Sequence, residues 1–213
     1  MNIVQQKKEK STPKVLVVID SIKQGGGAEK NAVRLASFLA EENYETLLLT
    51  FNSFQKEYHY SGNRMSLDER SSQNYVKKLI KYFSRLRHIK KICIQHGITH
   101  VISFLEVPNF SVLLSNIFLG LKATVIISVR ADIKRMGYLK RQIIRIIYSQ
   151  ADQIVAVSNV MKQILEREFK LKNVSVIYNP INLEQVSLES RIKLPVNFVF
   201  LVSSFITPPF LFL

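Results

Sequence analysis

The feature that most constrains the fold is an alternation of short apolar runs with longer segments of helical periodicity. Residues 14–20 form an almost continuous apolar run rich in valine, typical of a strand buried on both faces of a parallel sheet. A glycine-rich loop follows at residues 25–27, and apolar residues then recur at helical spacing over residues 28–42. Residues 44–51 indicate a second strand. This order and length predict a βαβ crossover unit.

The same alternation continues along most of the chain and predicts an α/β fold. We expect a Rossmann-like, mostly parallel sheet with helices on both faces. Gly97 is predicted to end a helix and Ser158 to cap one. Further strands are expected at residues 100–105, 123–128, 153–158 and 174–178, helices at 75–95, 110–119, 139–150 and 160–169, and irregular segments at 52–74 and 107–109.

Length and composition allow one well-buried core, since the chain has 213 residues of which 47% are hydrophobic. We expect a loose leader at residues 1–13 and the Rossmann-like domain at 14–183. Residues 184–213 are expected to hold a linker and the truncated start of a second domain. Residues 194–213 carry no charge, but Pro208-Pro209 would break a membrane-spanning helix, so the truncated strand is the preferred interpretation.

The net charge of +14 indicates either that the protein binds an anionic partner or that the fold tolerates repulsion among its own positive charges. Residues 71–105 contain no acidic side chain, and neither do residues 133–151. Basic amphipathic helices of this kind bind anionic membrane surfaces. A solvated outer face of a core helix is the alternative, whereas nucleic acid is disfavoured because no reader motif or stacking platform is present. The predicted membrane-surface residues are Lys77, Lys78, Lys81 and Arg85.

Cysteine and histidine usage argues against disulfides and metal sites. Cys93 is the single cysteine, which indicates a reducing, cytoplasmic setting, and no secretory signal is visible at the N-terminus. The four histidines have no metal-ligand spacing, so we predict no metal site.

The glycine loop is a candidate phosphate site. Gly25, Gly26 and Gly27 follow a strand and open a helix, where free backbone amides and the helix dipole favour an anion. The spacing is neither the dinucleotide fingerprint G-x-G-x-x-G nor the P-loop, which argues against NAD enzymes and ordinary ATPases. A flexible turn without a ligand is the other interpretation.

Polar residues after the predicted third and fourth strands form a second candidate site. Parallel sheets place ligands at the carboxyl ends of their strands. Glu106 and Asn109 are predicted to hydrogen-bond acceptor hydroxyls, and Arg130, followed by Asp132, to bind an acceptor or donor phosphate. Alternatively Glu106 and Arg130 are ordinary loop residues that pair with each other.

Two stretches together resemble a known family. Residues 14–20, followed by the three glycines and Ala28-Glu29-Lys30, resemble the start of a family 4 retaining glycosyltransferase. Residues 151–158 and 173–181, the latter containing Asn179-Pro180, resemble the signature at the end of that family's N-terminal domain. The resemblance covers residues 14–183 and implies a GT-B architecture. In it, the N-terminal domain holds the acceptor and the C-terminal domain binds a nucleotide sugar, usually without a metal.

The expected function is therefore that of the N-terminal, acceptor-side part of a glycosyltransferase. With a partner domain it would transfer a sugar from a nucleotide-sugar donor to a lipid-linked or polysaccharide acceptor in surface glycan synthesis. The nucleotide sugar would be a co-substrate, and no cofactor is expected. We expect a cytoplasmic location at the inner face of the membrane. The alternative is an inactive, non-enzymatic membrane-surface binding module that retains the fold.

Overall fold

A computed structural model describes residues 12–69, 74–130 and 137–179. Its centre is a seven-stranded, entirely parallel sheet in the order β3-β2-β1-β4-β5-β6-β7. The predicted α/β class is confirmed. The strands are β1 (Lys14–Ile19), β2 (Glu45–Thr50), β3 (Asn63–Ser66), β4 (His100–Phe104), β5 (Thr124–Val129), β6 (Gln153–Ala156) and β7 (Val174–Val176).

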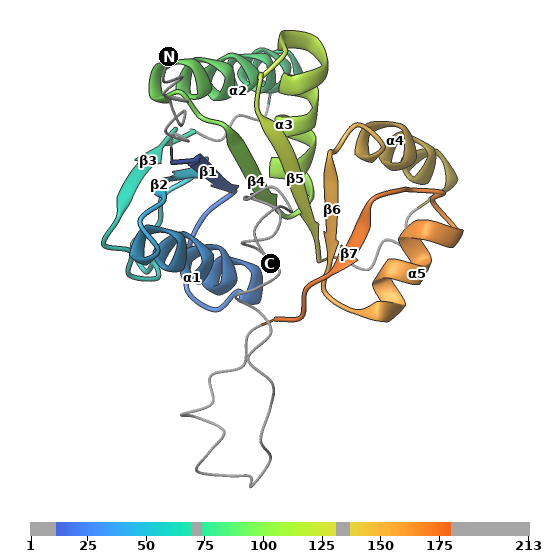
Figure 1. Ribbon diagram of the computed structural model, residues 1–213. Coiled ribbons are helices and arrows are strands. Elements are labelled where there is room, and N and C mark those ends of the chain that lie inside the picture. Colours follow the sequence, from blue (N-terminus) through green and yellow to red (C-terminus); the bar gives the residue numbers. More distant parts are fainter. Residues whose placement is uncertain (1–11, 70–73, 131–136, 180–213) are drawn as a thin grey trace, which may run out of the picture.

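Helices cover both faces of the sheet, as predicted (Figure 1). The core that contains α1 side chains lies on one face, and the core built from the other four helices lies on the opposite face. This division follows from right-handed crossovers, because the chain moves one way from β1 to β3 and the other way from β4 to β7. The helices are α1 (Gly27–Glu41), α2 (Tyr75–His96), α3 (Glu106–Leu119), α4 (Tyr138–Tyr148) and α5 (Asn159–Arg167).

Central strand β1 is buried on both faces. Leu16 and Val18 pack into the core shared with α2 to α5, whereas Val15, Val17 and Ile19 pack into the core shared with α1. This double burial explains the unbroken apolar run in the sequence.

Two segments predicted to be irregular have regular structure. β3 lies within residues 52–74, and the prediction missed it because this edge strand has no apolar run; it pairs with β2 through its backbone. α3 begins at Glu106 and so includes Pro108, which was predicted to be in a loop. Proline is tolerated in a first helical turn because the amide it lacks has no partner there.

The predicted helix signals at two termini are confirmed. Gly97 ends α2 in the left-handed conformation with φ +61°. Ser158 caps α5, where its hydroxyl oxygen accepts a hydrogen bond from the amide of Met161 at 3.1 Å.

A buried ion pair fastens α2 to the rest of the domain. Glu69 receives hydrogen bonds from Arg85 through both carboxylate oxygens, and Lys81 lies 3.1 Å from the same carboxylate. Arg85 also donates to the hydroxyl of Ser111 and stacks 4.2 Å from the ring centroid of Phe51. Arg85 is only 9% exposed. Its predicted place on a membrane-facing surface is therefore wrong, because the guanidinium is buried and holds α2 against the domain.

We expect Glu69→Gln to lower the free energy of unfolding by about 2 kcal/mol, because it leaves the Arg85 guanidinium without its charged partner. Burial opposes ionisation of Glu69, but the hydrogen bonds and charge of Arg85 outweigh it, so its pKa is lowered. A carboxylate whose pKa is lower in the folded state than in the unfolded state stabilises the fold at pH values above its unfolded-state pKa. This stabilisation is lost as the pH falls through the folded-state pKa. Urea unfolding at neutral and acidic pH should show the difference between variant and wild type shrinking at acidic pH.

Glu45→Gln is the matched control for this measurement. Glu45 pairs with Lys14 at 2.6 Å on the surface, where ion pairs contribute less than about 1 kcal/mol. A loss for Glu69→Gln no larger than that for Glu45→Gln would contradict the anchoring role of Arg85.

No helix within residues 12–69, 74–130 and 137–179 combines the length and apolar character needed to cross a bilayer. The uncharged stretch at 194–213 and its predicted strand lie outside the described residues.

Candidate acceptor-side site

The candidate site lies at the carboxyl edge of the sheet, beside the point where strand order reverses. β1 pairs with β2 on one side and β4 on the other, so the loops that follow β1 and β4 leave toward opposite faces. In open parallel sheets such a switch point leaves a crevice that binds ligands.

The glycine loop forms one wall of this edge. Gly25 has φ +105°, a conformation that favours glycine, Gly26 is the N-cap of α1, and Gly27 begins the helix. A Cβ atom at Gly25 or Gly27 would have no heavy atom within 4 Å, so the loop leaves open space beside its backbone. By contrast, a Cβ at Gly26 would overlap the carboxylate of Glu29, which folds back over the helix start.

The loop is held in place from the opposite side. Tyr58 places its hydroxyl between two loop residues, accepting a hydrogen bond from the amide of Gly25 at 3.2 Å and donating to the carbonyl of Gly26 at 3.3 Å. No sequence motif marks Tyr58, because its partners are backbone atoms. The Tyr58 hydroxyl thus connects the glycine loop to the segment that follows β2.

Arg130 lies at the end of β5 and is held from within the domain. Its Nε donates to the hydroxyl of Ser128 at 3.1 Å, and its guanidinium carbon lies 4.9 Å from the ring centroid of Phe104. Burial lowers the pKa of Arg130 to about 10, with the charge of Glu29 acting against this shift. The guanidinium therefore stays protonated at neutral pH.

Two asparagines complete this cluster, and neither was among the predicted site residues. Asn31 of α1 donates from Nδ2 to Oδ1 of Asn179 at 3.0 Å, and Arg130 donates from Nη1 to the same oxygen. Asn31 is buried although it lies in an otherwise apolar part of α1. A polar residue in a predicted apolar helix face was the one sequence signal that could have identified it.

Glu106 does not pair with Arg130, so the predicted pairing of these two residues is wrong. Its carboxylate lies 2.7 Å from the ammonium of Lys140, the third residue of α4. Leu105, just before it, has φ +72° and ψ 166°, a region that non-glycine residues rarely adopt. The chain accepts this strain where β4 passes directly into α3.

Asn109 is placed inside the domain rather than at its surface. It is 1% exposed; its amide accepts a hydrogen bond from Ser103 at 2.7 Å and donates to the carbonyl of Ser128 at 3.1 Å. It therefore joins the ends of β4 and β5. In this position its amide supports the strand that carries Arg130, whereas the sequence predicted contact with an acceptor.

Asn109→Ala should therefore destabilise the fold by about 2 kcal/mol, because it leaves the Ser103 hydroxyl and the Ser128 carbonyl without their buried partner. Thermal unfolding by circular dichroism measures this loss. Glu106→Gln, next to it but on a partly exposed side chain, is expected to change stability by less than about 1 kcal/mol. Equal stability of the two variants would argue against the bridging role.

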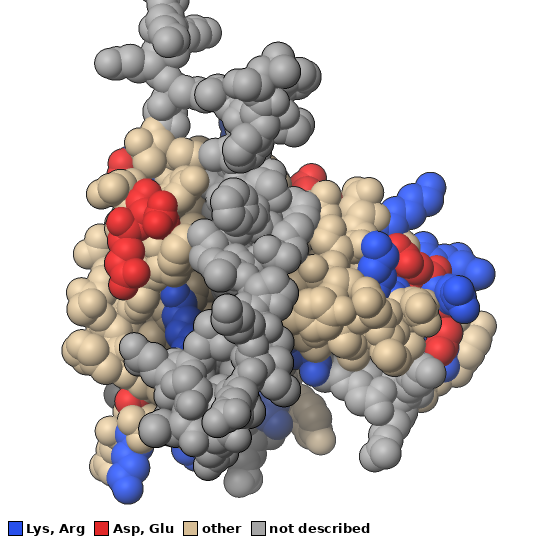
Figure 2. Space-filling view, turned by 60° about the horizontal axis from the view of Figure 1, so that its bottom comes forward, with Lys and Arg blue, Asp and Glu red and all other residues tan. Residues whose placement is uncertain are grey.

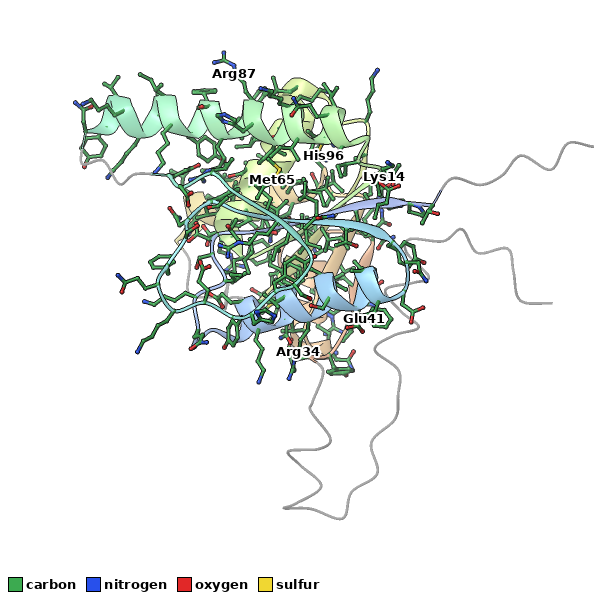
Figure 3. All side chains as sticks on the ribbon, turned by 90° about the vertical axis from the view of Figure 1, so that its left-hand side faces the viewer. Lys14, Arg34, Glu41, Met65, Arg87 and His96 are labelled. Atoms are coloured by element: carbon green, nitrogen blue, oxygen red, sulfur yellow. The ribbon has the colours of Figure 1, made fainter. Side chains whose placement is uncertain are left out.

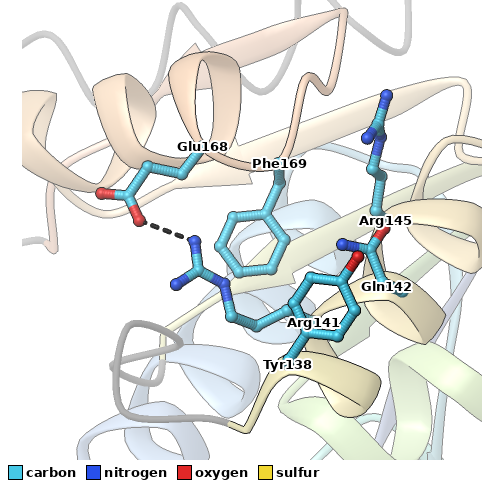
Figure 4. A pocket seen from close by; sticks show the side chains of 6 residues that line it. All are labelled: Tyr138, Arg141, Gln142, Arg145, Glu168 and Phe169. Carbon is cyan, nitrogen blue, oxygen red and sulfur yellow. Dashed lines mark hydrogen bonds and ion pairs between the residues drawn. The ribbon is translucent and has the colours of Figure 1, made fainter.

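A separate pocket of about 260 Å³ lies between α4 and the end of α5 (Figure 4). Arg141 crosses it to Glu168 at 2.9 Å and stacks 5.1 Å from the ring centroid of Phe169. None of the sheet-edge residues described above lines this pocket, and Arg141 is already engaged. We therefore place the candidate site at the sheet edge and not here.

Within the described residues, no group of three or more histidine, cysteine, aspartate or glutamate side chains is arranged to hold a metal ion. Asp132, predicted to follow Arg130 in the site, lies outside the described residues.

Comparison with known proteins agrees with this geometry. The sequence profile of Glycosyltransferase Family 4 matches residues 25–185, from the glycine loop past the end of β7. The chain belongs to glycosyltransferase family 4. The family resemblance inferred from the two sequence motifs is confirmed.

A curated relative of this family 4 chain is the amylovoran biosynthesis glycosyltransferase AmsD of Erwinia amylovora. It is 29% identical over 166 residues, which cover 78% of this chain and 45% of the relative. The chain thus spans about half the length of the curated relative it matches.

Solved structures share the fold. A glycosyltransferase from Rickettsia africae has a TM-score of 0.61 at 16% identity, covering 82% of this chain and 45% of that protein. Sucrose-phosphate synthase from Thermosynechococcus elongatus has a TM-score of 0.61 at 10% identity, covering 81% and 49%. At such low identity these neighbours establish the architecture of the family 4 domain and nothing about its substrates.

Proposed function

We propose that this chain is the acceptor-side part of a glycosyltransferase that builds a surface polysaccharide. Together with a donor-binding domain, it would transfer a sugar from a nucleotide-sugar donor to a lipid-linked or polysaccharide acceptor. The observation that carries the proposal is Arg130, which is braced by Phe104 and Ser128 at the carboxyl edge of the sheet. A fixed guanidinium at that edge suits a phosphoryl group, which it can bind through two parallel hydrogen bonds.

The described residues also explain why chemistry would need a second domain. The candidate site combines one guanidinium, amide side chains and backbone, which can position an acceptor. Transfer additionally requires the donor to be held against the acceptor, because orientation of the two reactants and stabilisation of developing charge lower the barrier. We therefore assign acceptor binding to this chain and donor binding to a partner domain.

A chimera tests this assignment. Residues 1–179 would replace the matching segment of the Erwinia relative, and sugar transfer from nucleotide sugars to membrane acceptors would be measured. Arg130→Ala is expected to lower transfer about 10- to 100-fold, the cost of losing a charged hydrogen-bond donor. Arg167→Ala, an exposed arginine at the end of α5, is the matched control and should leave transfer unchanged.

Equal activity of the Arg130→Ala and Arg167→Ala chimeras would contradict the proposed role of Arg130. No transfer by the wild-type chimera, beside an active Erwinia parent, would instead favour the non-enzymatic binding module.

We further propose that the N-terminal half of α2 binds an anionic membrane surface. This segment exposes the apolar side chains Tyr75, Val76, Leu79, Ile80 and Phe83. Lys77 and Lys78 are exposed among them, and residues 71–105 contain no acid. Apolar side chains interleaved with lysines match an interface that has lipid tails beside anionic headgroups.

The placement of α2 supports this surface. α2 lies on the opposite side of the sheet from α1, and Arg87 points away from the domain (Figure 3). By contrast, basic and acidic side chains mix on the side formed by α4 and α5 (Figure 2), where Arg141 pairs with Glu168 and Lys162 with Glu166. An anionic membrane would therefore meet Lys77 and Lys78 on a helix that has no acidic residue, whereas acidic side chains stand among the basic ones on α5. This contact would place the domain beside a lipid-linked acceptor.

Lys77→Glu combined with Lys78→Glu should weaken binding to phosphatidylglycerol-containing vesicles at least about tenfold, since each basic residue near the surface contributes about 1 kcal/mol. Lys81 is left unchanged because it contacts Glu69. The control is Lys170→Glu combined with Lys172→Glu, which changes the net charge by the same amount as the α2 double variant, at two exposed positions outside α2. Vesicle co-sedimentation measures both, and salt should weaken wild-type binding. Equal losses in the two double variants would exclude a specific α2 surface.

A further inference from the structure

Two hydrogen-bond donors from distant parts of the chain converge on a single oxygen. Asn31 Nδ2 of α1 and Arg130 Nη1 after β5 both donate to Oδ1 of Asn179, just beyond β7. Residues 31 and 179 are 148 positions apart in sequence. The convergence is therefore a product of the fold and not of local chain geometry.

The guanidinium in this arrangement has a neutral hydrogen-bond acceptor. Arg130 rests against the Phe104 ring, and its Nε is engaged by the Ser128 hydroxyl, so its position is set from behind. Toward the site its partner among the described residues is a carboxamide oxygen, which carries only a partial charge. An anionic phosphoryl oxygen would add the attraction between full opposite charges, and a guanidinium can bind a phosphoryl group through two parallel hydrogen bonds. The fold thus aims a positive group, together with a buried amide, at a place occupied by a neutral acceptor.

We propose that the Asn179 carboxamide occupies a phosphoryl-oxygen subsite, and that a diphosphate-bearing ligand displaces it. Arg130 and Asn31 would then donate to the phosphoryl oxygen, with the open space beside Gly25 and Gly27 receiving the rest of the group. This inference rests on the proposed function, and it adds a regulatory step to the same site.

Displacement has a consequence for the end of β7. Among the described residues, the contacts that hold Asn179 to α1 and to the end of β5 are the hydrogen bonds that its Oδ1 accepts from Asn31 and Arg130. A ligand that takes over these donors releases that tie, so ligand binding and release of the β7 end are coupled. Because the Asn179 oxygen and the ligand compete for the same donors, removal of the Asn179 carboxamide should strengthen ligand binding.

One nearby acid acts against the ligand. The carboxylate of Glu29, on the first turn of α1, is close enough for its charge to act on Arg130. It would repel an incoming phosphoryl group and lower its affinity. Glu29→Gln should consequently tighten diphosphate binding, in the same direction as removal of Asn179.

The test is calorimetric titration of the 213-residue chain with inorganic pyrophosphate. Asn179→Ala removes the intramolecular occupant and should tighten binding about three- to thirtyfold, the equivalent of one or two hydrogen bonds. Asn179→Asp keeps the shape but places a carboxylate on Arg130, and should weaken binding at least about tenfold. Arg130→Gln should abolish measurable binding.

Asn159→Ala is the matched control. Asn159 donates to the hydroxyl of Tyr178 at 2.9 Å, so its loss perturbs the same strand end without touching Arg130. Binding by this variant should equal that of the wild type. If Asn179→Ala binds pyrophosphate no more tightly than the wild type, Asn179 is not a displaceable occupant and the proposal is overturned.

Hydrogen exchange supplies an independent readout of the released tie. The amide of Ile177, which donates to the carbonyl of Ala156 at 2.9 Å, should exchange faster in the wild type when pyrophosphate is added. In Asn179→Ala it should be fast already and respond little. Unchanged exchange in the wild type at saturating pyrophosphate would overturn the coupling.

Two further ligands separate the possible sources of the diphosphate. Tighter binding of geranyl diphosphate than of pyrophosphate and UDP assigns the subsite to a lipid-linked acceptor, whereas tighter binding of UDP assigns it to the donor. Because binding to this chain needs no sugar transfer, failure of the chimera leaves the displacement test intact. Conversely, an active chimera with unchanged Asn179→Ala binding rejects only the displacement.

Discussion

The structure depends on one topological constraint, the right-handedness of the connections between parallel strands. From β1 the chain proceeds to β2 and β3 on one side, and β4 to β7 then follow on the other. This reversal sends the loops after β1 and β4 toward opposite faces. It also buries β1 from Val15 to Ile19, which is why this part of its sequence is a continuous run of valine, leucine and isoleucine. The candidate site lies where this reversal occurs, the place at which open parallel sheets generally bind their ligands.

The residues at that crevice divide into those that support and those that face it. Asn109 and Ser128 join neighbouring strand ends, and Tyr58 fixes the glycine loop. Arg130 is the charged group that this framework presents. Buried hydrogen bonds behind a few ligand-facing side chains are a general way to hold a site in a fixed geometry. Arg85 carries the same guanidinium group as Arg130, but Glu69 neutralises it inside the domain. We therefore assign Arg85 a role in the stability of the fold.

Membership of glycosyltransferase family 4 and the location of Arg130 give the domain a coherent role. An acceptor-side domain needs a place for a phosphoryl group and, for a lipid-linked acceptor, a surface that tolerates a bilayer. The sheet edge supplies the first in this proposal, and the exposed start of α2 supplies the second. The two features lie on separate elements, so each can be altered without the other.

The sequence by itself determined the fold class, most element positions, the caps at Gly97 and Ser158, and the family, because periodicity and short motifs are local properties of the chain. It missed β3, whose pairing is made by backbone at a polar edge, and it placed Pro108 in a loop although a first helical turn accepts proline. Only the tertiary structure decided which charges face outward. Arg85 and Arg130 look alike in sequence, but one meets Glu69 and the other Asn179. These partners lie 16 and 49 positions from their arginines, in segments that only the folded chain brings together, so neither pairing leaves a pattern that sequence spacing can reveal.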